Sequence, residues 1–254
     1  MNGRSARLPV RLGRALRSQA LSFAGDLPVV GVAVAAAVLS ASISAGIPAD
    51  AAAAPEAAKE ILARPMSTVI GVYAAVMAAV YGSFRYTIDR RTGVVAQRAT
   101  LHPRAWALVG RLPFTALGGA IVGAAVVLGG RLALLPVLGV IGLEARDVGA
   151  VVLVGAVASL WGLGVGLLVQ AHLPSLFLAP ISLSAAMLIA PVWPAFSAWL
   201  PLPALLRASG LDTAVLGIAI DTGPSPDFAV PLASAWIVAV VAAGGGSFLR
   251  RDLR

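Results

Sequence analysis

Six stretches of mostly apolar residues recur along the chain. A helix needs about 20 such residues to cross the hydrocarbon core of a bilayer. This criterion predicts spans at residues 28–47, 67–84, 105–128, 147–170, 173–194 and 228–248. The stretch Leu132–Leu143 is also apolar, but it is short and contains Pro136. We expect a membrane-dipping or interfacial piece there, and an all-α membrane protein of six transmembrane helices.

The first 27 residues predict a helix that lies in the membrane interface. Within residues 5–23, apolar and basic side chains fall on opposite faces at helical spacing. The apolar face holds Leu8, Leu12, Leu16 and Phe23, and the basic face holds Arg7, Arg11, Arg14 and Arg17. Such a helix places its arginines near anionic lipid head groups. A disordered basic tail is the alternative, because Pro9 and Gly13 interrupt the pattern.

The arginines predict the orientation of the spans. Thirteen of them lie before the first span, between the second and third, or after the sixth. The opposite side has only five basic residues (Lys59, Arg64, Arg131, Arg146 and Arg207) among eight acidic ones (Asp50, Glu56, Glu60, Glu144, Asp147, Asp212, Asp221 and Asp227). Positive residues favour the cytoplasmic side, so both termini are expected there, including the tail 249–254. A seventh span would place the C-terminal arginines outside.

The overall composition supports the membrane assignment. Hydrophobic residues make up 59% of the 254-residue chain and charged residues 12%, against roughly a quarter charged in soluble domains. The net charge of +8 does not indicate nucleic-acid binding, because the arginines flank apolar runs. Only Lys59 of the basic residues is lysine, and Ala, Gly and Pro are frequent. This usage is typical of GC-rich bacteria, so we expect a bacterial inner (plasma) membrane.

Several enzyme classes lack their motifs in this chain. There is no Gly-x-x-x-x-Gly-Lys-[Ser/Thr] phosphate loop, no His-Glu-x-x-His and no Gly-x-Ser-x-Gly. There is also no cysteine, which excludes disulfides, thiolate metal sites and cysteine nucleophiles. The predicted spans contain no acidic residue except Asp147 at an outer edge, which disfavours a proton-coupled pump. We expect a protein that is no enzyme by itself, holds no cofactor and takes its energy from outside the chain.

Features within the spans predict close helix packing. Small residues recur at four-residue spacing, which lets helix backbones approach each other in lipid. They are Ser40 and Ser44, Gly71, Ala75 and Ala79, Gly119 and Gly123, and Gly162 and Gly166. Arg111 falls about one turn inside the third span, before Pro113. We expect it to reach the head groups as an anchor, with a role in substrate passage as the alternative.

Two loops have distinctive sequences. The predicted cytoplasmic segment 85–104 is charged, is long enough for a short helix and ends at Pro103. It is either a helix that docks on a soluble partner or a solvated loop that fixes topology. The predicted outer loop 195–227 is broken by four prolines and adjoins Trp193 and Trp199. Within it, Pro203–Gly210 is expected to form a short helix on or dipping into the outer leaflet.

Two motifs give this arrangement a family resemblance. The first is Asp89-Arg-Arg-Thr-Gly-Val-Val followed by Leu101-His-Pro-Arg104, and the second is Leu160-Trp-Gly-Leu-Gly-Val-Gly-Leu-Leu-Val-Gln-Ala-His172. With six spans, an interfacial helix and a broken outer loop, the chain resembles the type-2 ATP-binding-cassette permeases. Members of that family carry a coupling helix between the second and third spans. The match is approximate, because the order here is Thr92-Gly93 and Gln170-Ala-His172 replaces an Arg-Asn pair.

The resemblance implies a function and its partners. Two permease subunits, identical or homologous, would pair in the membrane and bind two cytoplasmic ATPases, which hold ATP and Mg. The substrate would be apolar or amphipathic, such as a drug, a peptide antibiotic or a lipid-linked molecule, and would be exported. Coupling to the ATPase would rest on Asp89, Arg90, Arg91, Thr92 and Gly93, with Arg98 and Arg104 in support. The alternatives are a membrane scaffold or signalling subunit, and an ATP-independent carrier.

Overall fold

The structure is a computed structural model that describes residues 7–47, 49–63, 65–101, 103–138, 144–218 and 223–250. Several residues named above lie outside these ranges: Arg4, Arg64, His102, residues 139–143, Asp221, Arg251 and Arg254. The helices are α1 (Arg7–Ala24), α2 (Leu27–Ala41), α3 (Glu56–Ala63), α4 (Met66–Arg91), α5 (Val94–Leu101), α6 (Arg104–Leu138), α7 (Ala145–Val169), α8 (His172–Ile189), α9 (Pro194–Ser197), α10 (Pro201–Ala208) and α11 (Pro226–Arg250). Short 3-10 turns occur at Ser42–Gly46, Ala49–Ala53 and Ala214–Leu216, and the described residues contain no strand.

The structure has five helical runs that could span a membrane, or six if α1 and α2 are counted as one bent span, against the six predicted. Five helical runs are long and apolar enough to cross a membrane: Glu56–Arg91, Arg104–Leu138, Ala145–Val169, His172–Ile189 and Pro226–Arg250. The sixth candidate is the pair α1 and α2, which meets the criterion only together and bends by 53°. With 15 residues, α2 alone measures about 22 Å, less than the hydrocarbon core of about 30 Å. The chain is a multi-span helical membrane protein, and the all-α prediction is confirmed.

The predicted short helices are present, but one predicted break is absent. The segment between α4 and α6 contains α5, which agrees with one of the two alternatives given for it, and the segment after α8 contains α10, as expected. In contrast, residues 132–138 are the last two turns of α6 and not a separate interfacial piece. Pro136 lies inside that helix without ending it. A membrane helix can contain proline because neighbouring groups satisfy the carbonyl that proline leaves unbonded.

The core is built from backbones in close approach. A β-carbon on Gly162 of α7 would lie 1.9 Å from the carbonyl oxygen of Ala79 on α4. Between α6 and α7, a β-carbon on Gly119 would lie 2.4 Å from the carbonyl oxygen of Gly155. Ser40 of α2 donates to the carbonyl of Val126 on α6 at 2.7 Å. The small residues singled out in the sequence therefore lie at helix contacts, as predicted for packing in lipid, apart from Ser44, whose side chain is outside what the structure describes.

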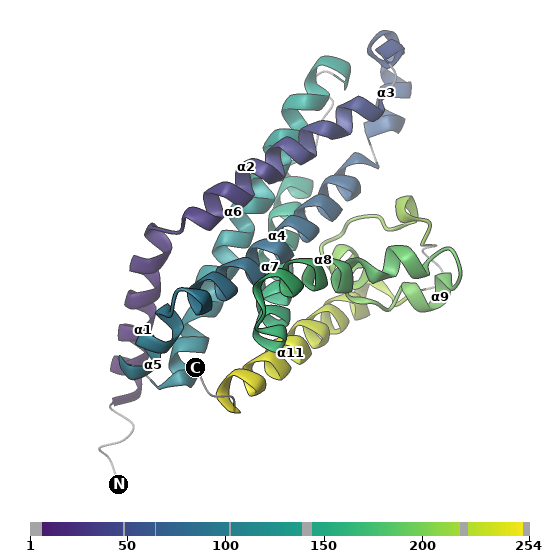
Figure 1. The fold of residues 1–254 in the computed structure, drawn as a ribbon. Coiled ribbons are helices and arrows are strands. Elements are labelled where there is room, and N and C mark those ends of the chain that lie inside the picture. Colours follow the sequence, from purple (N-terminus) through teal and green to yellow (C-terminus); the bar gives the residue numbers. More distant parts are fainter. Residues whose placement is uncertain are drawn as a thin grey trace.

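Helix α4 runs through the middle of the bundle and defines its two ends (Figure 1). The α5 end, where α4 leads into α5, also holds the first turns of α6 and the last turns of α7 and α11 (Figure 1). The α10 end lies at the start of α4, where Thr68 donates to the carbonyl of Asp212 at 2.8 Å. Apolar side chains such as Leu173, Phe177 and Leu188 of α8 are exposed, which suits a surface facing lipid.

Candidate functional site

One face of α4 carries a polar stripe toward the α5 end. Tyr81, Arg85 and Asp89 are spaced by four residues, so they lie one above another on the helix. Tyr81 and Arg85 are buried, and the side chain of Asp89 is 20% exposed. We call these three residues, with their partners Asp26, Thr115 and Arg111, the polar ladder.

The deeper part of the polar ladder is centred on Arg85. Its Nε lies 2.8 Å from Oδ2 of Asp26, and both side chains are only 5% exposed. Its Nη1 donates to Oγ1 of Thr115 on α6 at 3.2 Å. Tyr81 adds a hydrogen bond from its hydroxyl to Oδ2 of Asp26 at 2.9 Å. A charge buried in a membrane bundle is costly unless it is paired, and here both charges have partners.

Asp26 connects this pair to the N-terminal helices. It lies between α1 and α2, where the chain bends by 53°, and its carboxylate makes no capping bond to α2. The carboxylate bonds Arg85 and Tyr81 instead, while the guanidinium of Arg85 lies 5.4 Å from the ring centroid of Phe23 on α1. The bend between α1 and α2 is therefore held against α4 by Asp26 and by Phe23.

The outer part of the polar ladder joins both ends of the loop that carries α5. Arg111 of α6 forms an ion pair with Asp89 of α4. Its guanidinium also lies 5.5 Å from the ring centroid of Tyr86, a cation–π distance. Since α4 enters the loop and α6 leaves it, this pair holds the two helices together just above α5.

A second set of contacts joins α4 to the turn between α7 and α8. Arg90 donates to Oε1 of Gln170, which has a left-handed backbone with φ 58°. About one turn earlier on α4, Oγ1 of Thr87 lies 2.8 Å from Nδ1 of His172. The ring of His172 lies 5.2 Å from that of Phe84. The turn Gln170–His172 therefore contacts the last turns of α4 directly.

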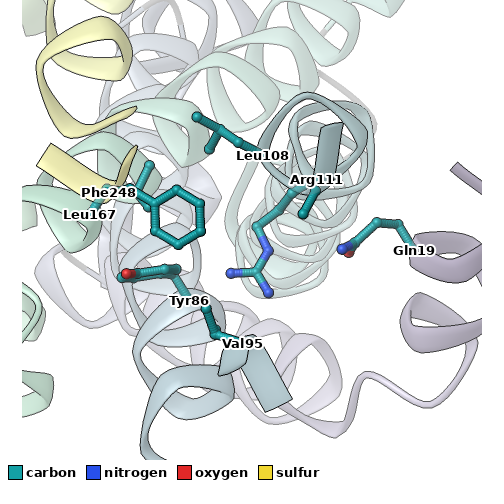
Figure 2. A pocket seen from close by; sticks show the side chains of 8 residues that line it. Gln19, Tyr86, Val95, Leu108, Arg111, Leu167 and Phe248 are labelled. Carbon is teal, nitrogen blue, oxygen red and sulfur yellow. The ribbon is translucent and has the colours of Figure 1, made fainter. Parts of the chain in front are cut away.

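A small cavity lies beside Arg111, between five helices and α5 (Figure 2). Its volume is about 20 Å³, and its walls are Gln19, Tyr86, Val95, Ala107, Leu108, Arg111, Leu167 and Phe248. Figure 2 shows the carboxamide of Gln19 and the guanidinium of Arg111 on neighbouring sides of this space. Oε1 of Gln19 is buried without a hydrogen-bond partner among the residues that the structure describes. A cavity of this size has room for one water molecule, which would satisfy that oxygen.

The arrangement suits mechanical coupling. Across the described ranges, no group of three His, Asp or Glu residues is placed to hold a metal ion. What the polar ladder provides is directional contact among α4, α6 and the bend between α1 and α2. A displacement of the α5 loop cannot leave these segments unchanged, because their buried charges must stay paired.

The predicted coupling residues are divided between the bundle and the loop surface. Asp89 and Arg90 contact Arg111 and Gln170, whereas Arg91 and Thr92 are exposed at the end of α4. Gly93 begins the loop with φ 76°, a left-handed conformation that favours glycine. Arg104 is half-buried at the start of α6. Arg98 lies on α5, and its side chain is outside what the structure describes.

Two sequence-based expectations were wrong. Arg85 was assigned to the loop 85–104, but α4 continues to Arg91 and Arg85 is 4% exposed inside the bundle. Arg111 was expected to reach the head groups, yet it is 5% exposed and paired with Asp89. The position of each arginine along its helix does not explain its burial. Both side chains point into the bundle, where Arg85 is paired with Asp26 and Arg111 with Asp89.

Three members of the polar ladder were not predicted from the sequence: Asp26, Tyr81 and Thr115. Two spacings carried a signal: Arg85 and Asp89 are four residues apart, as are Arg111 and Thr115. Polar residues so spaced on apolar helices share a face and indicate a polar contact between helices. Asp26 carried no such signal, because it precedes the first apolar run and meets Arg85 only through the tertiary fold.

The comparisons with known proteins identify no family. No protein-family model matches the chain, and no curated protein matches it either.

Proposed function

We propose that this chain is the transmembrane permease subunit of an ATP-driven exporter of the type-2 ATP-binding-cassette kind. It would move an apolar or amphipathic substrate out of a bacterial cell together with a separate cytoplasmic ATPase. One observation carries the proposal: a short helix, α5, lies between α4 and α6, and its loop is tied to the bundle by the ion pair Asp89–Arg111 and by the hydrogen bond from Arg90 to Gln170. A solvated loop that only sets topology has no need of such contacts.

In this proposal α5 is the coupling helix. The ATPase binds α5 and the exposed residues Arg91 and Thr92, and Gly93 gives the loop its sharp turn out of α4. Movement of the loop passes through Asp89 to α6 and through Arg90 to the turn between α7 and α8. Two such subunits, identical or homologous, then rock between inward-open and outward-open states. ATP and Mg belong to the partner ATPase.

The proposal is tested by capture of the partner. The full chain is purified from its native membrane in mild detergent, and the proteins that accompany it are identified by mass spectrometry. A soluble ATPase in equal amount is the expected result. Recovery of the chain alone, repeated from lipid nanodiscs, would overturn the proposal.

A pair of matched glycine variants tests the role of the loop. Gly93 has φ 76° and Gly217 has φ 73°, and a β-carbon at either would meet nothing within 4 Å. Gly93→Trp, at the α5 end, is expected to abolish ATPase capture, and Thr92→Arg to do the same. Gly217→Trp, at the opposite end, imposes equal backbone strain and is expected to leave capture intact. Equal capture by all three variants would contradict the assignment of α5.

An ATP-independent carrier is the second candidate, favoured by the buried pair Asp26–Arg85. Ionisable residues inside a membrane bundle mark ion or substrate pathways in many transporters. Substrate movement in vesicles that contain only this chain, lost in Asp26→Asn, would favour the carrier over the exporter.

A further inference from the structure

Helices α7 and α11 touch closely near the α5 end and separate toward the α10 end. A β-carbon on Gly244 of α11 would lie 2.4 Å from the carbonyl oxygen of Gly164 on α7. On Gly164, a β-carbon would lie 2.9 Å from the carbonyl carbon of Val240. From about one turn further toward the α10 end on α7, and about two turns on α11, the helices no longer fill the space between them, and a groove of about 340 Å³ opens.

The groove is apolar and is closed at one end by α10. Its walls are Leu153, Val157 and Leu160 of α7, Leu205 and Ala208 of α10 with Ser209, and Val230, Ala233, Ser234, Ile237 and Val238 of α11. The hydroxyl of Ser209 donates to the carbonyl of Leu205, so it is satisfied within its own segment. Trp236 fixes the segment just before α10, since its Nε1 donates to the carbonyl of Trp199 at 2.9 Å.

The groove faces sideways, out of the bundle. Leu153, Val230 and Val238 are 52%, 54% and 65% exposed. They belong to two helices that are each long and apolar enough to cross a membrane. The opening therefore lies where hydrocarbon, rather than water, surrounds the protein.

We propose that this groove binds one acyl chain of a membrane phospholipid. Water does not fill an apolar cavity, because it would lose its hydrogen bonds there. A helix of a second copy is too wide: the whole space left by protein atoms is about 740 Å³. That volume equals less than two turns of a helix about 10 Å across. A flexible hydrocarbon chain that enters from the side fits both the shape and the apolar lining.

The proposal is independent of transport and of the ATPase. It requires that the groove hold a lipid chain more persistently than the rest of the lipid-facing surface. The exposed apolar stripe of α8, with Leu173, Phe177 and Leu188, provides the internal comparison, because it is equally apolar but forms no wall of this groove.

Photo-crosslinking tests the proposal. The full chain is reconstituted in phosphatidylcholine vesicles that contain a small fraction of phosphatidylcholine with a photoactivatable group on one acyl chain. After irradiation, mass spectrometry maps the adducts. Adducts are expected to be severalfold denser on residues 153–160 and 230–238 than on α8. An even distribution would overturn the proposal, and so would a groove without adducts beside a labelled α8, which would indicate a protein cover such as a second copy.

A matched pair of variants on α11 sharpens the test. Ala233 lines the groove, whereas Ala239 is exposed on the same helix outside it. Ala233→Phe fills the groove and is expected to lower its adducts severalfold, while Ala239→Phe leaves them unchanged. Equal adduct maps for the two variants would contradict the proposal. If Ala233→Phe fails to insert, the adduct map of the unaltered chain still decides.

Discussion

The two ends of α4 are held in different ways. At the α5 end, Arg85 and Asp89 form ion pairs with Asp26 and Arg111, all of them buried or nearly so. At the α10 end, Thr68 donates one hydrogen bond to the carbonyl of Asp212, but no ion pair holds α4 there among the described residues. The neighbours of Gly71 are the apolar side chains of Leu206, Leu211 and Val151, and the groove between α7 and α11 opens nearby. Ionic contacts depend on direction and partner, whereas apolar contacts tolerate sliding.

The difference bears on the coupling proposed for the α5 loop. A loop fixed by buried ion pairs must carry α4, α6 and the N-terminal bend with it, or leave a charge unpaired. The contrast is consistent with the proposed input at the α5 loop.

The largest effect is expected from removing one partner of the deepest ion pair. Arg85→Met leaves the carboxylate of Asp26 buried without its counter-charge, so the free energy of unfolding should fall by about 3–5 kcal/mol. Unfolding by sodium dodecyl sulfate in mixed micelles measures this change. The double variant Asp26→Leu with Arg85→Met should recover much of the loss, because no charge is then left buried. A double variant as unstable as the single one would show that the pair does not act through charge.

A smaller loss of stability is expected when only the hydroxyl that donates to Asp26 is removed. Tyr81→Phe keeps the ring and its packing but deletes the hydrogen bond to Oδ2 of Asp26. Hydrogen bonds to charged groups contribute about 1.5–3 kcal/mol, so the same assay should show a loss in that range. Tyr73→Phe on the same helix, where the structure gives no such bond to a carboxylate, serves as the control. No difference between the two variants would remove Tyr81 from the polar ladder.

A methyl group added at each end compares the two kinds of packing directly. On Gly118, a β-carbon would lie 2.2 Å from the hydroxyl oxygen of Tyr81, which is fully buried and bonded to Asp26. On Gly71, it would lie 2.8 Å from a terminal methyl of Leu211. Gly118→Ala should cost about 1–3 kcal/mol, the usual price of overpacking. Gly71→Ala should cost less, because the end of a leucine side chain can rotate away; the reverse order would contradict the contrast between the ends.

The sequence was sufficient for five of the six predicted spans, because a span is recognised by length and hydropathy alone. The first, 28–47, meets that criterion only together with α1. The sequence was not sufficient to predict which polar side chains face the interior of the bundle. Arg85 and Arg111 lie near predicted span ends, so the sequence placed Arg85 in the loop 85–104 and Arg111 in the head-group region. Their burial depends on the direction in which each side chain points. Arg85 also needs Asp26, which lies 59 positions earlier in the chain at the bend between α1 and α2. The groove was equally hidden, since it arises from the angle between α7 and α11 and not from their composition.

The smallest effect is expected at the surface pair on α3. Lys59 lies 3.4 Å from Glu56; the side chain of Lys59 is 15% exposed and that of Glu56 is 75% exposed. Because the carboxylate that is altered lies mostly in water, where salt screens its charge, Glu56→Gln should change the free energy of unfolding by less than about 0.5 kcal/mol. Arg85→Met and Glu56→Gln each break one ion pair. The main difference between the two pairs is how deeply they are buried. If Glu56→Gln were as damaging as Arg85→Met, burial would not explain the stability of the polar ladder, and the contrast between the two ends of α4 would lose its physical basis.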